Sequence, residues 1–365
     1  MAVYKIFPSK DATLDSQNIL ANTGLDEIIE LSTVVNNSIV YNKRPIIQFS
    51  QTEIDNVLNN IIQGDYKSYL KLFLANASNI PTSYTLQCFP VSGSWNMGTG
   101  RYSDSSSIEN GVSWKYRTTS GSNAWSTSNF GLNVTASYST ISGGGTWYYT
   151  SLIGTSSQTF DYISSKDINF DVTNIINSFS SSSIENNGFI IKKEDSLEFD
   201  SNSPFSLSYF STDTHTIYPP QLEFKWNDYI FNTGSSSQEI INDPDFKVTL
   251  NNNSGVFYTE DIFKFRINTR PTYPSRVFQT SSIYTNNYYL PTSSYYAVKD
   301  LDTDEFVIDF DNTYTKISAD STSNYFKIYM NGLEPERYYK ILIKVNIDGQ
   351  TIISDDNHYF KIVNG

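Results

Sequence analysis

The stretch "GLEPERYYKILIKV", residues 332–345, decides the fold class of this chain. Ile341, Ile343 and Val345 recur at every second position, which places them on one face of a β-strand, while Tyr338 points to the opposite face from Tyr339. The whole chain shares this character, with 27 Tyr and 23 Phe among 365 residues and many Ser, Thr and Asn. Aromatic and β-branched residues favour strands, and Asn, Ser and Gly favour the turns between them. The sequence therefore predicts an all-β protein.

The same stretch contains a second pattern at the start of its strand. Leu333, Pro335 and Tyr339 have the spacing L-x-P-x-x-x-Y. This spacing resembles the tyrosine corner of fibronectin type III and related Ig-like sandwiches. The resemblance implies a Tyr339 ring buried beside Leu333, with a hydroxyl that bonds a backbone group a few residues upstream and fixes the loop through Pro335. We therefore expect residues 228–365 to form a C-terminal Ig-like β-sandwich.

The first part of the chain also reads mainly as strands, with two short helices between them. In "SQTEIDNVLNNIIQG", residues 50–64, Ser50 and Glu53 have the spacing of a capping box, and apolar residues recur at helical intervals. In "FDVTNIINSF", residues 170–179, Asp171 is placed to cap a second helix. Residues 92–158 are rich in Gly, Ser and Trp and have weak periodicity, so we predict a long insertion on one side of a sandwich.

A series of short motifs in this part carries a family resemblance. They are "KDATLDSQNILANTGLDEIIEL" (10–31), "RPIIQFS" (44–50), "LKLFLA" (70–75), "SGSWNMGTGRY" (92–102), "GVSWKYR" (111–117), "FDVTNIINSF" (170–179), "NNGFIIKK" (186–193) and "PPQLEFKW" (219–226). In this order they resemble the DNRLRE-type β-sandwich, a jelly-roll module similar to carbohydrate-binding modules. The resemblance covers roughly residues 4 to 227. It implies a jelly-roll-like sandwich over residues 1–227, with the Gly/Ser/Trp-rich insertion at residues 92–158.

The opening "KIFPSKDATLDSQNILANTGLDEIIEL", residues 5–31, also resembles virion structural proteins of T4-like phages that infect marine bacteria. This resemblance implies a bacteriophage virion protein of the tail, neck or capsid exterior. Its partners would be other virion proteins, with a homo-oligomer or multiple copies in one particle. The N-terminus turns polar before any apolar stretch long enough for a signal peptide, which fits synthesis in the host cytoplasm.

Composition argues against several classes of protein. The net charge is −13, and an acidic surface repels phosphates, so nucleic acid is not an expected partner. No segment approaches the ~20 apolar residues of a membrane helix, so no membrane contact is expected. The single cysteine, Cys88, cannot form an intramolecular disulfide.

Catalytic and cofactor motifs are not recognisable in the sequence. Neither His215 nor His358 has a metal-ligand spacing such as H-E-x-x-H, and no G-x-S-x-G elbow is present. Paired carboxylates of a glycosidase need only meet in space, and no pair stands out. We therefore predict a protein that is not an enzyme and needs no cofactor.

Three tryptophans in the polar insertion, Trp95, Trp114 and Trp125, allow two interpretations. Their ring faces suit stacking on sugars, in which case the chain is a glycan-binding or host-receptor module whose ligand is host surface polysaccharide. Large aromatic side chains are more often buried than displayed, which favours a plug that covers the open end of the sandwich. We expect the core role.

"DLDTDE", residues 300–305, places Asp300, Asp302 and Asp304 at the alternate spacing used by calcium loops. Glu305 occupies the position where an EF-hand loop requires Gly, and no flanking helices are evident. A polar hairpin turn is the preferred interpretation, and no metal site is predicted. The sequence as a whole predicts a noncatalytic structural component of a virion that acts through protein–protein contacts, with glycan binding as the alternative.

Overall fold

A computed structural model describes residues 2–102, 110–118, 123–125, 143–149, 154–234, 239–273 and 288–365. Much of the predicted insertion at 92–158 lies outside these ranges, namely residues 103–109, 119–122, 126–142 and 150–153. The described chain consists of many β-strands, arranged mostly in antiparallel pairs, with only short helices. The predicted all-β fold built of β-sandwiches is confirmed.

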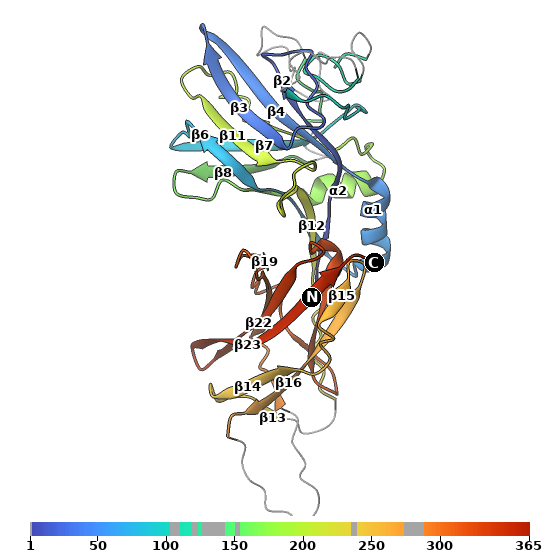
Figure 1. Ribbon diagram of the computed structural model, residues 1–365, viewed down its shortest axis with the longest axis vertical. Coiled ribbons are helices and arrows are strands. Elements are labelled where there is room, and N and C mark those ends of the chain that lie inside the picture. Colours follow the sequence, from blue (N-terminus) through green and yellow to red (C-terminus); the bar gives the residue numbers. More distant parts are fainter. Residues whose placement is uncertain are drawn as a thin grey trace, which may run out of the picture. The chain divides into compact units, whose positions relative to one another are not determined.

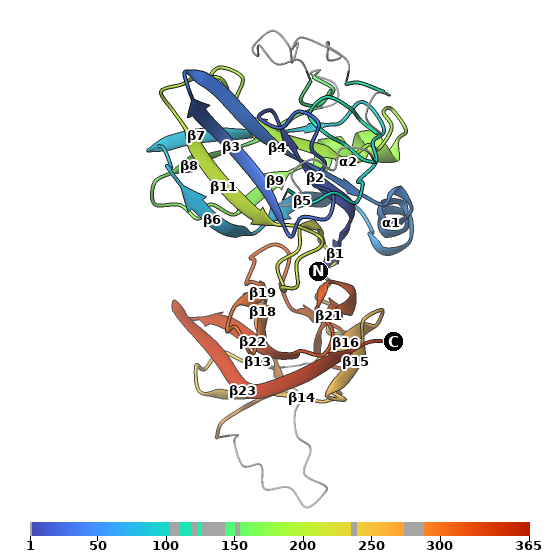
Figure 2. The same ribbon diagram turned by 45° about the horizontal axis from the view of Figure 1, so that its top comes forward.

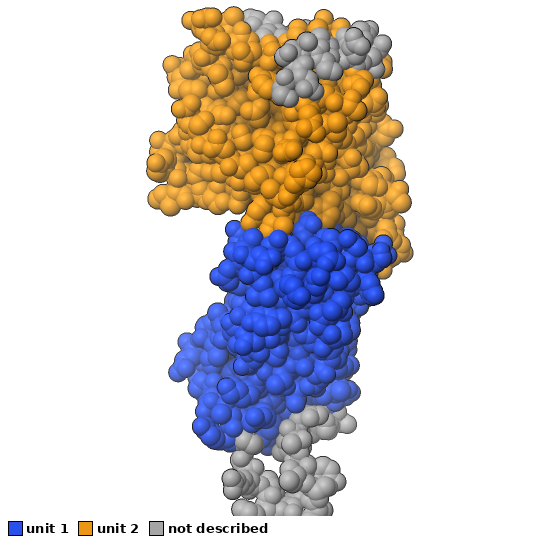
Figure 3. Space-filling model, viewed as in Figure 1, with its two compact units in different colours: residues 1–5, 63–66, 224–365 blue, residues 6–62, 67–223 orange. Residues whose placement is uncertain are grey.

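The chain divides into two compact units (Figure 3). Residues 6–62 and 67–223 form the N-terminal unit, and residues 1–5, 63–66 and 224–365 form the C-terminal unit. The predicted domain boundary after residue 227 lies close to Phe224, where the last crossing occurs, but residues 1–5 and 63–66 also belong to the C-terminal unit. Strands β1 (Ala2–Ile6) and β12 (Gln221–Trp226) carry the chain across these boundaries.

An extended sheet in the order β6-β11-β3-β4-β10-β7-β8, with β2 also paired to β4, dominates the N-terminal unit (Figures 1 and 2). A second pair, β5 with β9, is antiparallel. The bounds are β2 (Pro8–Asp15), β3 (Ile28–Asn36), β4 (Ile39–Phe49), β5 (Tyr66–Leu72), β6 (Leu74–Ser78), β7 (Ser83–Pro90), β8 (Ser156–Asp161), β9 (Ile168–Asp171), β10 (Phe189–Lys193) and β11 (Phe205–Phe210).

The centre of this sheet is buried on both faces, which explains its consecutive apolar residues. Ile46 and Ile190 pack against the tryptophan-rich segment. Their neighbours in sequence point to the other face, where the ring of Phe189 lies between Phe49 and Phe179 of the second helix. Strands that are covered on two sides need no polar face, so "PIIQF" and "GFIIK" carry apolar residues in succession.

Both predicted helices form, but the capping box is wrong. Helix α1 (Gln51–Asn56) continues as a π-helical turn, Val57–Ile61, and the Ser50 side chain makes no capping hydrogen bond. The backbone carbonyl of Ser50 accepts the N–H of Ile54 at 3.1 Å, which is the ordinary first hydrogen bond of a helix. Before helix α2 (Thr173–Ser180), the Asp171 carboxylate does accept the N–H of Thr173 at 3.1 Å. Within the described ranges, no helix is long and apolar enough to cross a membrane.

The C-terminal unit is a sandwich of two sheets, in the orders β13-β17-β16-β21-β20, with β14 also paired to β16, and β15-β23-β22-β18-β19. Phe265 and Phe326 of the first sheet and Tyr296, Tyr339 and Phe360 of the second belong to one buried core. The bounds are β13 (Glu239–Ile240), β14 (Phe246–Leu250), β15 (Val256–Tyr258), β16 (Ile262–Pro271), β17 (Tyr288–Tyr289), β18 (Ser294–Asp300), β19 (Phe306–Ile308), β20 (Ser318–Ala319), β21 (Asn324–Tyr329), β22 (Tyr338–Ile347) and β23 (Gln350–Val363).

Candidate functional site

The three predicted tryptophans lie in the core of the N-terminal unit. Trp95, Trp114 and Trp125 are 1%, 0% and 4% exposed. They pack against residues of β2, β4, β7 and β10, so they cover a face of the sheet. The indole N–H of Trp95 donates to the Asn187 carbonyl at 2.9 Å, and that of Trp125 donates to the Ser113 carbonyl at 2.9 Å. Rings held in this way present no open face to a sugar.

A buried ion network that the sequence analysis missed lies against these rings. The Arg44 guanidinium lies over Trp114, at 4.9 Å from the ring centre, and its Nε donates to Glu198 at 2.6 Å. Lys192 approaches the other oxygen of Glu198 at 2.9 Å. Burial alone raises the pKa of Glu198, but Arg44 and Lys192 outweigh burial and lower that pKa. The network is structural: Glu198 offsets part of the buried positive charge of Arg44 and Lys192, and Asp195, 2.5 Å from the Lys192 amine, supplies a second carboxylate.

The side chain of Asn22 packs closely against glycines near Trp95. Its Nδ2 donates to the carbonyls of Met97 and Val112 at 2.7 and 2.8 Å, and its Oδ1 accepts the N–H of Gly100 at 2.7 Å. A Cβ at Gly98 would lie 2.4 Å from the Asn22 Oδ1, so a side chain does not fit there. The Gly-rich stretch is therefore closely packed around one asparagine.

The acidic loop at residues 300–305 is closed by internal cations. Asp300 is 1% exposed and accepts hydrogen bonds from Arg337 Nε and Nη2, both at 2.6 Å, and from the N–H of Asp302 at 2.9 Å. Burial raises the pKa of Asp300, but the Arg337 hydrogen bonds prevail and lower it. Asp304 pairs with Lys299 at 2.8 Å. The side chains of Arg337 and Lys299 thus neutralise Asp300 and Asp304, which agrees with the interpretation of residues 300–305 as a polar turn.

The corner tyrosine has the predicted geometry. Tyr339 is buried in the same core as Leu333, and its hydroxyl donates to the Glu334 carbonyl at 2.9 Å, five residues upstream. Pro335 lies in the loop that this bond closes, between Glu334 and Tyr339. Burial, with Asp300 and Glu334 nearby, raises the pKa of the Tyr339 phenol. The hydrogen bond predicted for this residue is confirmed.

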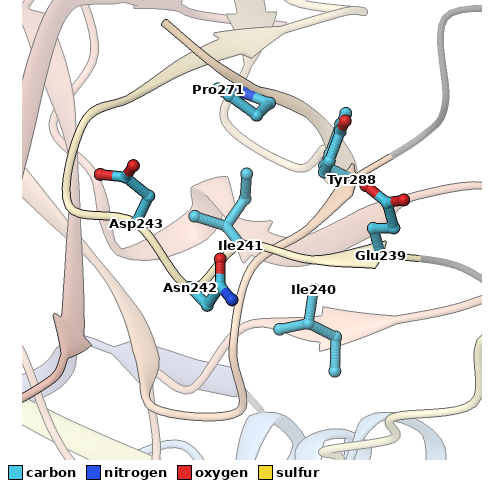
Figure 4. A pocket seen from close by; sticks show the side chains of 7 residues that line it. All are labelled: Glu239, Ile240, Ile241, Asn242, Asp243, Pro271 and Tyr288. Carbon is cyan, nitrogen blue, oxygen red and sulfur yellow. The ribbon is translucent and has the colours of Figure 1, made fainter. Parts of the chain in front are cut away.

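A small pocket of about 210 Å³ opens beside β13 and β17 in the C-terminal unit. Figure 4 shows the seven residues that line it, namely Glu239, Ile240, Ile241, Asn242, Asp243, Pro271 and Tyr288. Burial and a hydrogen bond to Glu239 raise the pKa of Tyr288. The volume is below the roughly 300 Å³ at which ligand pockets usually begin, and no residue predicted from the sequence lines it.

The outward face of the sheet β15-β23-β22-β18-β19 is the most distinctive exposed surface. Register pairs place Tyr338 beside Lys361 and Lys340 beside Tyr359, so these side chains share a face. Tyr338 is 52% exposed. We call the following set the aromatic–lysine face: Val256, Tyr258, Tyr295, Lys299, Phe306, Phe310, Tyr338, Lys340, Lys344, Ile353, Tyr359 and Lys361.

Each lysine of the aromatic–lysine face lies over a ring. Lys361 lies 5.8 Å from the ring centre of Tyr338, Lys340 lies 5.7 Å from that of Tyr359, and Lys344 lies 5.0 Å from that of Tyr295. Lys299 lies 4.8 Å from the ring centre of Phe306. Carboxylates partner three of these lysines, in the pairs Lys299–Asp304, Lys340–Asp355 and Lys361–Glu336. The face is therefore amphipathic and nearly neutral.

Metal-ligating and nucleophilic side chains are scattered through the described chain. None of its Asp, Glu, His or Cys side chains gather in groups of three or more that fit a metal ion. Cys88 is buried, which raises the pKa of its thiol and disfavours the reactive thiolate. His215 is exposed, and His358 lies on β23, so the two histidines belong to different units.

Comparison with known proteins does not place this chain in a family. No protein-family model and no curated protein matches this sequence. A crystal structure of a DUF4785 family protein from Legionella pneumophila is 10% identical with a TM-score of 0.17, and the match covers 100% of this chain and 62% of that chain. The β-glucuronidase of Parabacteroides merdae is 11% identical with a TM-score of 0.16, over 85% of this chain and 30% of that chain. Likenesses this distant carry no argument about function.

Proposed function

We propose that this protein is a noncatalytic structural component of a bacteriophage virion and that it acts through protein–protein contacts. The aromatic–lysine face carries the proposal. It exposes Phe306, Tyr338, Ile353 and Tyr359 at the surface of a sheet, and amphipathic tyrosine rings supply contact area at low entropic cost. The partner is another protein of the same particle, as the resemblance of residues 5–31 to virion proteins implies.

The charge pattern of the face favours a protein partner over a nucleic acid. Three of its four lysines are partnered by carboxylates of the same chain, so few cations are left to neutralise phosphates. Glycan binding is the less favoured function. Lys361 and Lys340 lie over the rings of Tyr338 and Tyr359, where a sugar would have to stack.

Mass spectrometry of purified particles of the encoding virus tests the location of the protein. We expect the chain in intact particles at a fixed copy number. Particles that are infectious and complete without it would contradict the proposal.

The incorporation of variant chains into virus particles tests whether the aromatic–lysine face makes the contact. In particles assembled without the native chain, Tyr338→Ala/Tyr359→Ala is expected to reduce incorporation at least about tenfold, as loss of central aromatic contacts does. Tyr273→Ala is the matched control, because Tyr273 is 85% exposed in the same unit but is not part of the face. Equal incorporation of both variants would exclude this surface.

A calorimetric titration with host surface polysaccharide separates the glycan-binding alternative. Saturable binding that Tyr338→Ala abolishes would replace the protein–protein proposal with a glycan-binding one.

A further inference from the structure

The turn between β8 and β9, residues 161–167, displays two adjacent apolar side chains on the N-terminal unit. Ile163 is 93% exposed and Tyr162 is 74% exposed. Among the described residues, Ile163 is the most exposed large hydrophobic side chain. Single exposed apolar residues are common on protein surfaces, so exposure alone would need no explanation. What distinguishes this pair is the structure of the turn that carries it.

Asp161 closes the turn from its first position. Its Oδ1 accepts the N–H of Ile163 at 3.0 Å and the N–H of Ser164 at 2.6 Å. The Ser164 hydroxyl donates to the Asp161 carbonyl at 3.0 Å and accepts the Asp161 N–H at 3.1 Å. The bond from the Ser164 N–H is the main cause that lowers the pKa of Asp161. The carboxylate is therefore ionised at neutral pH and fixes the backbone at Ile163.

Lys166 braces the same turn from within. It is 8% exposed, and its ammonium donates to the carbonyls of Asp161 at 2.8 Å, of Tyr162 at 3.3 Å and of Ser164. An ammonium has three N–H donors, so these three carbonyls satisfy it. The Lys166 carbonyl in turn accepts the Tyr209 hydroxyl at 3.0 Å, which ties the turn to β11. The backbone that carries the two apolar side chains is therefore ordered before any partner binds.

We propose that Tyr162 and Ile163 form an anchor that inserts into an apolar pocket on another protein, with basic side chains or N–H groups at the pocket rim. A preordered turn loses little further backbone entropy on binding, and a few well-buried side chains carry most of the affinity of an interface. Asp161 and Asp167, at the two ends of the turn, are exposed, so the rim of the pocket must complement negative charge. The identity of the partner rests on the proposed function: it is another protein of the same particle.

A lipid bilayer is the less favoured occupant of this anchor. The exposed carboxylates of Asp161 and Asp167 and the net charge of −13 oppose an approach to anionic headgroups. Even a single myristoyl chain gives only marginal membrane binding, and two side chains offer no more apolar surface than that. The anchor is also distinct from the aromatic–lysine face, which belongs to the C-terminal unit. The chain would therefore contact its neighbours through both of its units.

Site-specific crosslinking in purified particles tests the anchor. Tyr162→p-benzoylphenylalanine places a photoreactive ring at the tip of the turn, and Tyr273→p-benzoylphenylalanine is the control, because Tyr273 is 85% exposed but lies in the C-terminal unit. We expect position 162 to crosslink to one virion protein, at apolar residues, with several times the yield of position 273. Equal yields from a chain that is present in the particles would overturn the anchor and leave the proposed function standing. A chain missing from the particles would overturn the proposed function and, with it, this partner.

Substitutions in the turn separate the apolar contact from the ordering of the backbone. Ile163→Ser should lower incorporation into particles at least about tenfold, whereas Ile163→Val should retain it, and both should keep the native Tm because the side chain is exposed. Lys166→Met keeps both apolar side chains but removes three hydrogen bonds, and should lower incorporation severalfold. Equal incorporation of the Ser and Val variants would overturn the anchor. Cosedimentation of the chain with phosphatidylcholine–phosphatidylglycerol vesicles, abolished by Ile163→Ser, would replace the protein pocket with a lipid surface.

Discussion

Two adjacent tyrosines, Tyr338 and Tyr339, show how much a single position in a strand decides. The Tyr339 ring packs on Phe360 at 5.6 Å between ring centres and its hydroxyl bonds the Glu334 carbonyl, whereas Tyr338 is half exposed. We expect Tyr339→Phe to lower the free energy of unfolding by about 1 kcal/mol and Tyr339→Ala by about 3–5 kcal/mol. Tyr338→Ala should cost clearly less. Denaturant unfolding of the full chain measures these values, and equal losses from both Ala variants would disprove the corner assignment.

Glu198 holds two buried cations, so its removal should be costly. Glu198→Gln leaves the buried Arg44 without its carboxylate partner and Lys192 with only the partly exposed Asp195, and should destabilise the chain by about 3–5 kcal/mol. Because folding lowers the pKa of Glu198, its stabilisation is present above the ordinary pKa of 4.5 and is lost as the pH falls through the folded value. Glu336→Gln, at the exposed pair with Lys361, is the control and should cost at most about 1 kcal/mol. A similar cost for both variants at neutral pH would show that the network is not buried.

Asp11 should give the opposite pH dependence. Its pKa rises from 3.8 to about 7 on folding, so the folded state binds the proton more tightly than the unfolded state. The stability contribution is therefore full below pH 3.8 and is lost as the pH rises through about 7, by about 4 kcal/mol in total. Denaturant unfolding at a series of pH values measures this slope. Asp11→Asn should remove it, and an unchanged slope in that variant would assign the effect elsewhere.

Among the elements, strands could be predicted well and helix ends less well. Alternating residues such as Ile341, Ile343 and Val345 do lie on the buried face of β22, because burial of one sheet face imposes a period of two. The Ser50–Glu53 spacing predicted a capping box that does not form, because the spacing alone does not fix the rotamer of the Ser50 side chain, which makes no capping hydrogen bond.

Residue pairs far apart in sequence could not be predicted at all. Arg44 and Glu198 are 154 positions apart, and neither has a local signal for the other. The same holds for Asp11 and Thr212, and for the neighbours across β22 and β23 that build the aromatic–lysine face. Sheet register decides these contacts, and register depends on the whole fold.

The tryptophan-rich segment depends on glycine where it meets the Asn22 turn. A Cβ at Gly24 would lie 2.2 Å from the Met97 carbonyl oxygen, so Gly24→Ala must displace backbone. We expect a loss of about 1–3 kcal/mol and a red shift of tryptophan emission as the segment loosens. Gly64→Ala is the control. Alanine at position 64 strains the backbone, because φ is 88°, but no atom lies within 4 Å of the Cβ position. A red shift in the control or none in Gly24→Ala would contradict this account.

At the scale of the whole molecule, the tryptophan cluster and the tyrosine-corner core are separate clusters that share no residue. Trp114 belongs to the cluster of the N-terminal unit, and Tyr339 belongs to the core of the C-terminal unit. Perturbations that share no contact add, whereas perturbations within one packed cluster couple. Each core should therefore lose its own stability independently of the other.

A double-mutant cycle on the full chain tests this independence. Trp114→Ala and Tyr339→Ala should each cost about 3–5 kcal/mol, because each opens a cavity in a core. The two costs should add in the double variant to within about 0.5 kcal/mol. As the matched cycle, Tyr339→Ala with Phe360→Ala should couple by more than about 0.5 kcal/mol, because these rings stack. Calorimetry of the four variants and the native chain supplies the values. Strong coupling between Trp114 and Tyr339 would contradict the separation of the two cores, because coupling requires that the loss of one core changes the packing of the other.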